Sequence, residues 1–192
     1  MEKEPKREYL PRIIEKTRKA RIQTEKRLLC LDALLRHVTV FYSSISIVLS
    51  LMPLFLHDAS GRVLDAISFL SIASAVIFTI CSLYASGQNY AVRAERIKFA
   101  YLELQRIALE LDDAIESAGR EDTTQRIDSI AEHYVDIVSR TENHTDMDFR
   151  IGTGRADGFE LLRYSIQLMG LRLGIYLALP IALVLITFVV CF

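Results

Sequence analysis

The sequence predicts an all-α membrane protein, in which a transmembrane helical hairpin continues into a cytoplasmic antiparallel helical bundle and a third transmembrane helix follows at the C-terminus. Two uncharged apolar stretches of 19 residues, 38–56 and 66–84, flank a short polar turn. A third uncharged stretch of 20 residues, 173–192, ends the sequence. Each stretch is close to the ~20 residues that a helix needs to cross the hydrocarbon layer of a bilayer. No β pattern of any length appears between them.

The two central stretches are expected to span the membrane together. Neither keeps the charged stripe that a soluble core helix normally presents to water. Two full-length helices also satisfy their own backbone hydrogen bonds in lipid, and Asp58 and Gly61 supply turn chemistry between them. We therefore divide the chain into a basic cytoplasmic helix (1–37), the transmembrane hairpin (38–84), a cytoplasmic helical region (85–171) and a third transmembrane helix (172–192).

The charges predict an orientation in the membrane. Residues 1–37 carry eleven Lys and Arg against six Asp and Glu, whereas residues 85–172 carry eleven against sixteen, so the two polar parts are electrostatically complementary. Basic residues lie on both outer flanks of the hairpin, and Arg62 stands alone near the turn. The positive-inside rule then places the N-terminus and both flanks in the cytoplasm and the C-terminus outside. The three cysteines are isolated and indicate neither a disulfide framework nor a zinc site.

Amphipathic helices are expected on both sides of the hairpin. The first runs from about Pro11 into the first span, with an apolar stripe that is polar in its middle. The second repeats the heptad spacing, ends near Gly119 and leaves the bilayer antiparallel to the first. A third is capped by Asp122, and residues 141–158 are expected to form a loop before a short amphipathic stretch at 159–168. The two stripes are Leu10, Ile14, Thr17, Arg21, Thr24, Leu28, Leu31 and Leu35, and Ile97, Tyr101, Leu104, Ala108, Leu111 and Ile115.

Small residues follow one face of each predicted span. Such faces usually indicate close helix packing with interhelical hydrogen bonds. They are also compatible with the wall of a pore, although no charged residue lies within either central span to mark an ion path. Small residues at every fourth position of the last span predict contact with a partner helix, either in the same chain or in a further copy, and the second case would give a homo-oligomer. These faces comprise Ser43, Ser46 and Ser50 in the first span, Ser71, Thr79 and Ser82 in the second, and Gly170, Gly174, Ala178 and Ala182 in the last.

The segment after the third amphipathic helix is the candidate signal-coupling loop, formed by Asn143, His144, Asp148 and Arg150. An Asn and a His at a helix end can bond its unpaired carbonyls and fix how the chain turns back. A metal site at His144, Asp146 and Asp148, or a phosphate loop at residues 152–154, is disfavoured because neither has the required spacing or context. No catalytic constellation stands out, so we expect no enzyme, no cofactor and no metal.

The chain resembles the SLATT family. The resemblance covers roughly residues 10–150 and combines the N-terminal helix, the close membrane hairpin and the long helix that starts AVRAERIKFAYLELQRIALEL. Its most specific part is SRTENHTDMDF, residues 139–149, in which Glu142, Asn143, His144 and Asp148 resemble the family's ENH...D pattern. Members are small bacterial membrane proteins found in defence loci beside nucleotide-second-messenger synthases, nucleotide-sensing domains or reverse transcriptases. Most have two spans, so the third span here departs from that minimum.

The resemblance implies a membrane effector of an anti-phage defence system that oligomerises and permeabilises or depolarises the bacterial inner membrane on activation. The alternative is a membrane adaptor that forms no pore and holds a defence enzyme at the bilayer through its cytoplasmic bundle. The partners implied are the lipid bilayer, further copies of the chain, and a nucleotidyltransferase, its nucleotide product or a reverse transcriptase complex. The sequence does not decide among these triggers.

Overall fold

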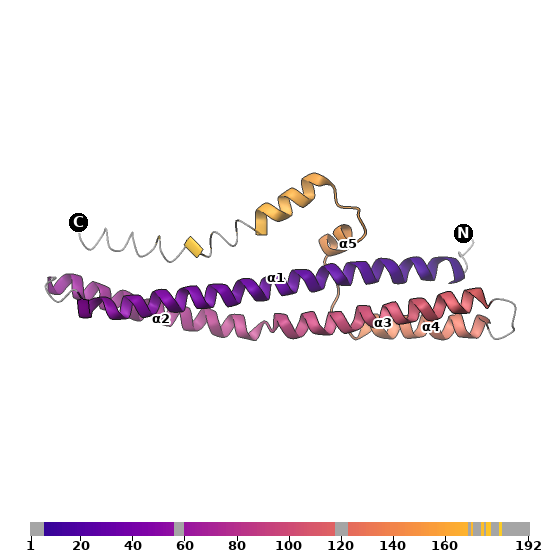
Figure 1. Ribbon diagram of the computed structural model, residues 1–192, viewed down its shortest axis with the longest axis horizontal. Helices are drawn as coiled ribbons and strands as arrows, with labels where there is room; N and C mark the ends of the chain where they lie inside the picture. Colours follow the sequence, from indigo (N-terminus) through magenta and orange to yellow (C-terminus); the bar gives the residue numbers. More distant parts are fainter. Residues whose placement is uncertain are drawn as a thin grey trace. The chain divides into compact units, whose positions relative to one another are not determined.

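Helices account for nearly all of the residues that the computed structural model describes (Figure 1). The described residues are 6–55, 60–117, 123–168, 170, 174, 176, 177 and 181, with the side chain of Ile77 excepted. Residues 158–168 are helical, and no strand occurs within the described part. The all-α prediction is confirmed for these residues. The labelled helices are α1 (Lys6–Phe55), α2 (Gly61–Gly87), α3 (Tyr90–Glu116), α4 (Thr123–Ser139) and α5 (Asp146–Gly152).

Contacts within the chain separate it into two units. The first unit contains Met1–Cys30 and Tyr90–Leu161, and the second contains Leu31–Asn89 and Leu162–Phe192. Helix α1 contributes its first half to the first unit and its second half to the second unit.

The first unit packs α1, α3 and α4 around an apolar core, and a smaller cluster of Leu28, Ala94 and Ile97 joins α1 to α3. Apolar side chains at heptad spacing on each helix meet there, because positions three and four residues apart share one helical face. The polar middle of the α1 stripe is buried as well, since Arg21 and Thr24 are almost fully covered. The core consists of Leu10 and Ile14 from α1, Ala100, Leu104, Ile107, Leu111 and Ala114 from α3, and Ile127, Ile130 and Ile137 from α4.

The second unit contains the two helices that are apolar enough to cross a membrane. One apolar window lies in α1 and the other in the stretch Gly61–Glu116. Only 0% and 12% of these windows are buried, whereas the core helix of a soluble protein would be mostly covered. Their large side chains face outward instead, as lipid contact requires. The most exposed include Val40, Ile47, Val48, Leu54 and Phe55 on α1, and Phe69, Ile72, Ile80 and Leu83 on α2.

Two sequence-based boundaries are wrong. Helix α1 already includes Lys6, ahead of the predicted start near Pro11, because a proline near a helix start removes only one backbone hydrogen bond. The predicted loop at residues 141–158 contains α5, Asp146–Gly152, whose first turn is capped by Thr145. Short helices of this kind show too few residues to display a helical period.

Several predicted features fall on residues that the structure does not describe. The third transmembrane helix lies almost wholly among these residues. Gly170 and Gly174 of its small-residue face are described, are helical and are exposed. Outside the described residues are Asp58 of the turn, Gly119 and Asp122 at the helix ends, and Ala178 and Ala182 of the last span.

Candidate functional site

The polar residues in the middle of the α1 stripe hold the C-terminal end of α4. The Thr17 hydroxyl lies 3.0 Å from the Tyr134 hydroxyl on α4. The Arg21 guanidinium donates to the Thr141 hydroxyl just beyond α4, and also to the Val138 carbonyl at 3.4 Å. Acceptors at two of its nitrogens offset part of the cost of burying this guanidinium in an apolar seam. This explains why polar side chains stand where the heptad pattern calls for leucine.

Asp148 fastens α5 to the same seam. The whole residue is 1% exposed. Its Oδ2 accepts hydrogen bonds from Thr24 Oγ1 at 3.2 Å and from Arg27 Nη2 at 2.9 Å. Arg27 Nε lies 3.1 Å from both carboxylate oxygens, so the two side chains make a forked contact. We call Arg27 and Asp148 the α5 ion pair.

The same carboxylate caps α5. Thr145 Oγ1 accepts from the Asp148 backbone N–H at 3.2 Å, and Asp148 Oδ2 accepts from the Thr145 backbone N–H at 3.2 Å. This reciprocal capping box satisfies two backbone donors at the start of the helix. One side chain therefore sets both the start of α5 and its attachment to α1.

The environment of Asp148 favours its ionised form. Burial alone would raise the pKa of the carboxyl group, but hydrogen bonds from Arg27 and Thr145 and the charge of Arg27 outweigh it, so the pKa lies below its usual value. A carboxylate that accepts several hydrogen bonds and faces a guanidinium behaves in this way. The α5 ion pair is therefore charged at neutral pH.

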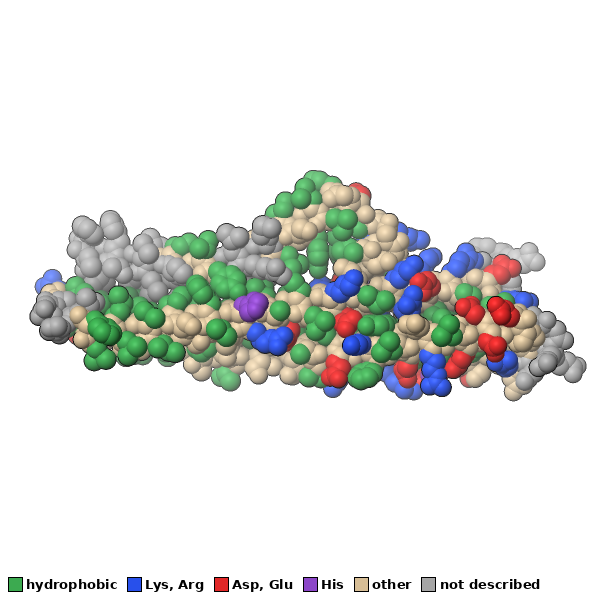
Figure 2. All heavy atoms as spheres, in the orientation of Figure 1, with side chains coloured by type: hydrophobic (Ala, Val, Ile, Leu, Met, Phe, Trp, Pro, Cys, Tyr) green, Lys and Arg blue, Asp and Glu red, His purple; other side chains and the backbone are tan. Residues whose placement is uncertain are grey.

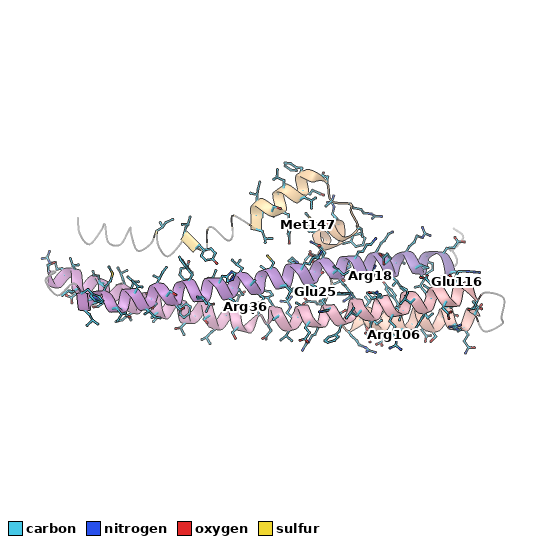
Figure 3. All side chains as sticks on the ribbon, viewed as in Figure 1. Arg18, Glu25, Arg36, Arg106, Glu116 and Met147 are labelled. Atoms are coloured by element: carbon cyan, nitrogen blue, oxygen red, sulfur yellow. The ribbon has the colours of Figure 1, made fainter. Side chains whose placement is uncertain are left out.

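Gly152 allows the C-terminal end of α5 to touch the α1 backbone. A Cβ atom at this position would lie 2.6 Å from the Lys19 carbonyl oxygen and 3.0 Å from the Ala20 nitrogen. Because these are backbone atoms of a helix, they cannot move aside as a side chain can. Figure 3 shows α5, with Met147 labelled, beside the stretch of α1 that carries Arg18 and Glu25.

An aromatic stack lies next to the α5 ion pair. The His144 and Phe149 rings stack with centroids 5.6 Å apart, and the Arg155 guanidinium lies over Phe149 at 5.8 Å. Burial and the nearby Arg21 charge lower the pKa of His144. The imidazole is thus neutral at pH 7. Two atoms here, Arg21 Nε and His144 Nδ1, are buried without a hydrogen-bond partner among the described residues.

The structure brings together only part of the predicted signal-coupling loop. Asp148 and His144 approach α1, whereas Arg150 forms an ion pair with Glu160 in the following helical segment. Asn143 is exposed. The predicted capping of α4 by Asn143 and His144 is absent from the hydrogen bonds of the described part, where Thr141 Oγ1 donates to the Ile137 carbonyl at 3.1 Å instead.

Residues of α1 complete this site, and the sequence-based prediction missed them. Arg27 is 121 positions away from Asp148, and no local pattern links the two. A signal was nevertheless present, because polar side chains at core positions of a heptad stripe require polar partners. Thr145 with Asp148 three residues later was also a readable capping box.

The hydroxyl groups of the predicted pore or packing face bond within their own helices. Ser43 donates to the Val40 carbonyl at 2.9 Å, and Ser50 donates to the Ile47 carbonyl at 2.8 Å. Thr79 donates to Ala75 in the same manner at 2.8 Å. Backbone acceptors thus satisfy these hydroxyls without a partner helix. Ser46, Ser71 and Ser82 are partly buried.

Among the described residues, no three His, Cys, Asp or Glu side chains gather in a way that could hold a metal ion.

A family match covers nearly the full length of the chain. Over residues 3–192 the chain matches the family described as SMODS and SLOG-associating 2TM effector domain family 5. The chain belongs to the SLATT family. Its two long apolar helices fit the two transmembrane segments in that description, and a SLATT domain makes it a membrane effector linked to defence systems.

The match extends beyond the residues that carried the sequence resemblance. It includes the C-terminal segment, so that segment is part of this SLATT family's pattern rather than an appendage to it. Neither a curated protein nor a solved structure matches this SLATT chain.

Proposed function

We propose that this SLATT protein self-associates in the bacterial inner membrane and depolarises it when a defence partner signals phage infection. The exposed apolar surface of the second unit carries the proposal. Several side chains on α1 and α2 are more than 60% exposed, among them Leu54, Phe69 and Leu83. Apolar surface of this extent is costly in water and is typical of segments that face lipid or another copy. Figure 2 shows few charged side chains along the visible face of this unit.

The α5 ion pair provides the element through which a signal would act. This pair attaches α5 to α1 near Thr24, and α1 is one continuous helix from Lys6 to Phe55. When this contact forms or breaks, it therefore acts on the same helix that supplies one of the two apolar windows. We propose that a nucleotidyltransferase, its nucleotide product or a reverse transcriptase complex shifts this contact, and that the chain itself catalyses no reaction.

Depolarisation is tested in cells that express the chain with its neighbouring genes. A potential-sensitive dye is expected to report loss of membrane potential within minutes of phage addition. Replacing Ser46 and Ser50 by Val keeps the span apolar but removes hydroxyls from one face, so the potential is expected to persist. Ile47→Val changes an exposed apolar position on the same helix and serves as the matched control.

The outcomes separate the effector from the adaptor. Unchanged potential in cells that remain protected would contradict depolarisation and support an adaptor that holds a defence enzyme at the bilayer. Loss of potential in the double serine variant would agree with depolarisation by the chain but would show that the hydroxyl face is not needed for it.

We also propose that the N-terminus is cytoplasmic and the C-terminus periplasmic, because basic residues flank the hairpin on one side of the membrane only. Alkaline phosphatase needs disulfides that form in the oxidising periplasm. A fusion after Phe192 is therefore expected to be active, and a fusion before Met1 inactive. The reverse pattern would overturn the orientation. Activity at neither end would place both termini in the cytoplasm and contradict a third span.

A further inference from the structure

A basic groove lies on the first unit beside the contact between α5 and α1. Its volume is about 490 Å³, and its floor is formed by one face of α1 and by the chain that leaves α5. Four of its seven lining residues are basic and one is acidic. The lining residues are Pro11, Arg12, Glu15, Lys16, Lys19, Thr153 and Arg155.

The single carboxylate in the groove is already neutralised. Glu15 accepts from Arg18 at 2.8 Å and lies 3.2 Å from Lys19 Nζ. Arg18 is not a lining residue, so the groove keeps an excess of positive charge. The contact between Lys19 and Glu15 is exposed, and exposed pairs of this kind are weak enough for an incoming anion to displace. Figure 2 shows Lys and Arg side chains in blue along α1 next to α5.

The positive charges come from two segments that meet only because α5 is docked. Lys16 and Lys19 belong to α1, whereas Thr153 and Arg155 follow α5. The Arg155 backbone is held by a hydrogen bond of 2.8 Å to the Arg150 carbonyl, and its guanidinium by Phe149. A guanidinium, two ammonium groups and a threonine hydroxyl are the donors that phosphate oxygens prefer.

A second groove of similar size gives an internal contrast. It lies against α4, and its charged lining consists of Lys6 with Asp128, Glu132 and Asp136. The two grooves therefore have opposite charge, although both lie on the first unit. An excess of basic residues is a property of the α5 groove and not of the whole unit, which selects the α5 groove for an anion.

We propose that the groove between α1 and the end of α5 binds a phosphate-bearing anion, such as a nucleotide, and that this anion bridges Lys16 and Lys19 to Arg155. The volume lies within the range of small-molecule sites and suits a phosphorylated group of nucleotide size. Bound there, the anion stabilises the docked position of α5 by linking the two segments. This binding does not require that the spans conduct ions, so it and the depolarisation proposal can fail separately.

Pyrophosphate is the probe for a test with the full chain in phosphatidylcholine nanodiscs. Titration calorimetry is expected to show saturable binding that weakens as salt rises. Lys16→Glu and Arg155→Glu are each expected to weaken it at least tenfold. Lys98→Glu makes the same charge change at an exposed position on α3 outside the groove and is expected to alter the dissociation constant less than twofold.

A further variant tests the geometry without touching any charge. Gly152→Val should displace α5 from α1 and abolish pyrophosphate binding, whereas Gly158→Val, where a Cβ meets nothing within 4 Å, should retain it. Equal weakening by all three charge variants, or full binding by Gly152→Val, would overturn the site. Absence of saturable pyrophosphate binding in phosphatidylcholine nanodiscs would refute the proposal.

Discussion

Asp148→Asn is expected to release α5 from α1. The amide cannot replace the charge that Arg27 faces, so a guanidinium with 23% of its side chain exposed loses its counter-ion. Breaking a buried ion pair by removing one partner costs about 3 kcal/mol. Hydrogen exchange of the amides at residues 146–152 should then accelerate roughly a hundredfold. Protection against phage should be lost, because α5 is the element that we expect a signal to move, while the amount of protein in the membrane stays unchanged.

Matched variants separate the ion pair from a general effect of charge. Asp136→Asn breaks the exposed pair between α4 and Arg140, the residue that follows it, and is expected to change exchange by less than about twofold. Arg27→Met combined with Asp148→Asn removes both charges and should be less destabilising than Asp148→Asn alone. If the double variant were less stable than Asp148→Asn, the unpaired charge of Arg27 would not be the cause of the lost stability. A fall in protein level equal to the loss of protection would show a purely structural role.

Acid should weaken the docking of α5 in two stages. The pKa of His144 is lowered by burial and by the charge of Arg21 when α5 is docked. As pH falls below about 6.5, His144 therefore takes up a proton more readily in the state in which α5 has left α1, and this state is favoured. The pKa of Asp148 is lowered as well, so its contribution is complete above about 4 and is lost as pH falls further, through the value in the docked state. His144→Phe should abolish the first stage alone when hydrogen exchange is followed against pH.

Gly152→Val is expected to displace the end of α5 while leaving every hydrogen-bonding side chain in place. The new side chain would overlap the Lys19 carbonyl, since even its Cβ would lie 2.6 Å from that oxygen. Forcing extra atoms into a packed contact costs about 1–3 kcal/mol, and more where backbone must move. Faster exchange at residues 146–152 and faster cleavage by trypsin after Arg150 and Arg155 are the measurements.

Gly158→Val controls for the exchange of glycine for valine as such, because a Cβ there has no neighbour within 4 Å. Gly154 is unsuitable as a control, since its φ of 69° strains any side chain. Native exchange rates in Gly152→Val would show that α5 does not need close backbone contact with α1. A melting transition lost from the whole chain would indicate a folding defect, and Gly152→Ala then provides the smaller change.

The helices of this chain could be predicted from sequence where the period had room to repeat. The stripes through Leu10 and Ile14 and through Leu104 and Leu111 identified the core of the first unit, because each spans several turns. Helix α5 has 7 residues and few apolar positions, so composition made it resemble a loop. Its capping box was the stronger local signal, but the Asn and Gly residues around it outweighed that signal.

The candidate site was predicted at one end only. Asp148 and His144 were selected from the loop, whereas Arg21 and Thr24 were assigned to a helical stripe without a partner and Arg27 to no pattern. Sequence spacing within a helix determines which side chains share a face, but not which distant segment that face meets. In the structure Arg150 pairs with Glu160, only ten positions away, so this contact joins two neighbouring segments and does not reach α1.

The polar middle of the α1 stripe also determines the register in which this helix pairs with the rest of the first unit. If α1 slid by one heptad, Leu28, Leu31 and Leu34 would take the places of Arg21, Thr24 and Arg27. The Asp148 carboxylate would then lie against Leu31 and Leu34 with no cation to face, at a cost of several kcal/mol. An all-leucine stripe would tolerate such a slip, because every heptad would be equivalent. The polar residues thus exclude neighbouring registers, and only one axial position of α1 leaves Asp148 paired.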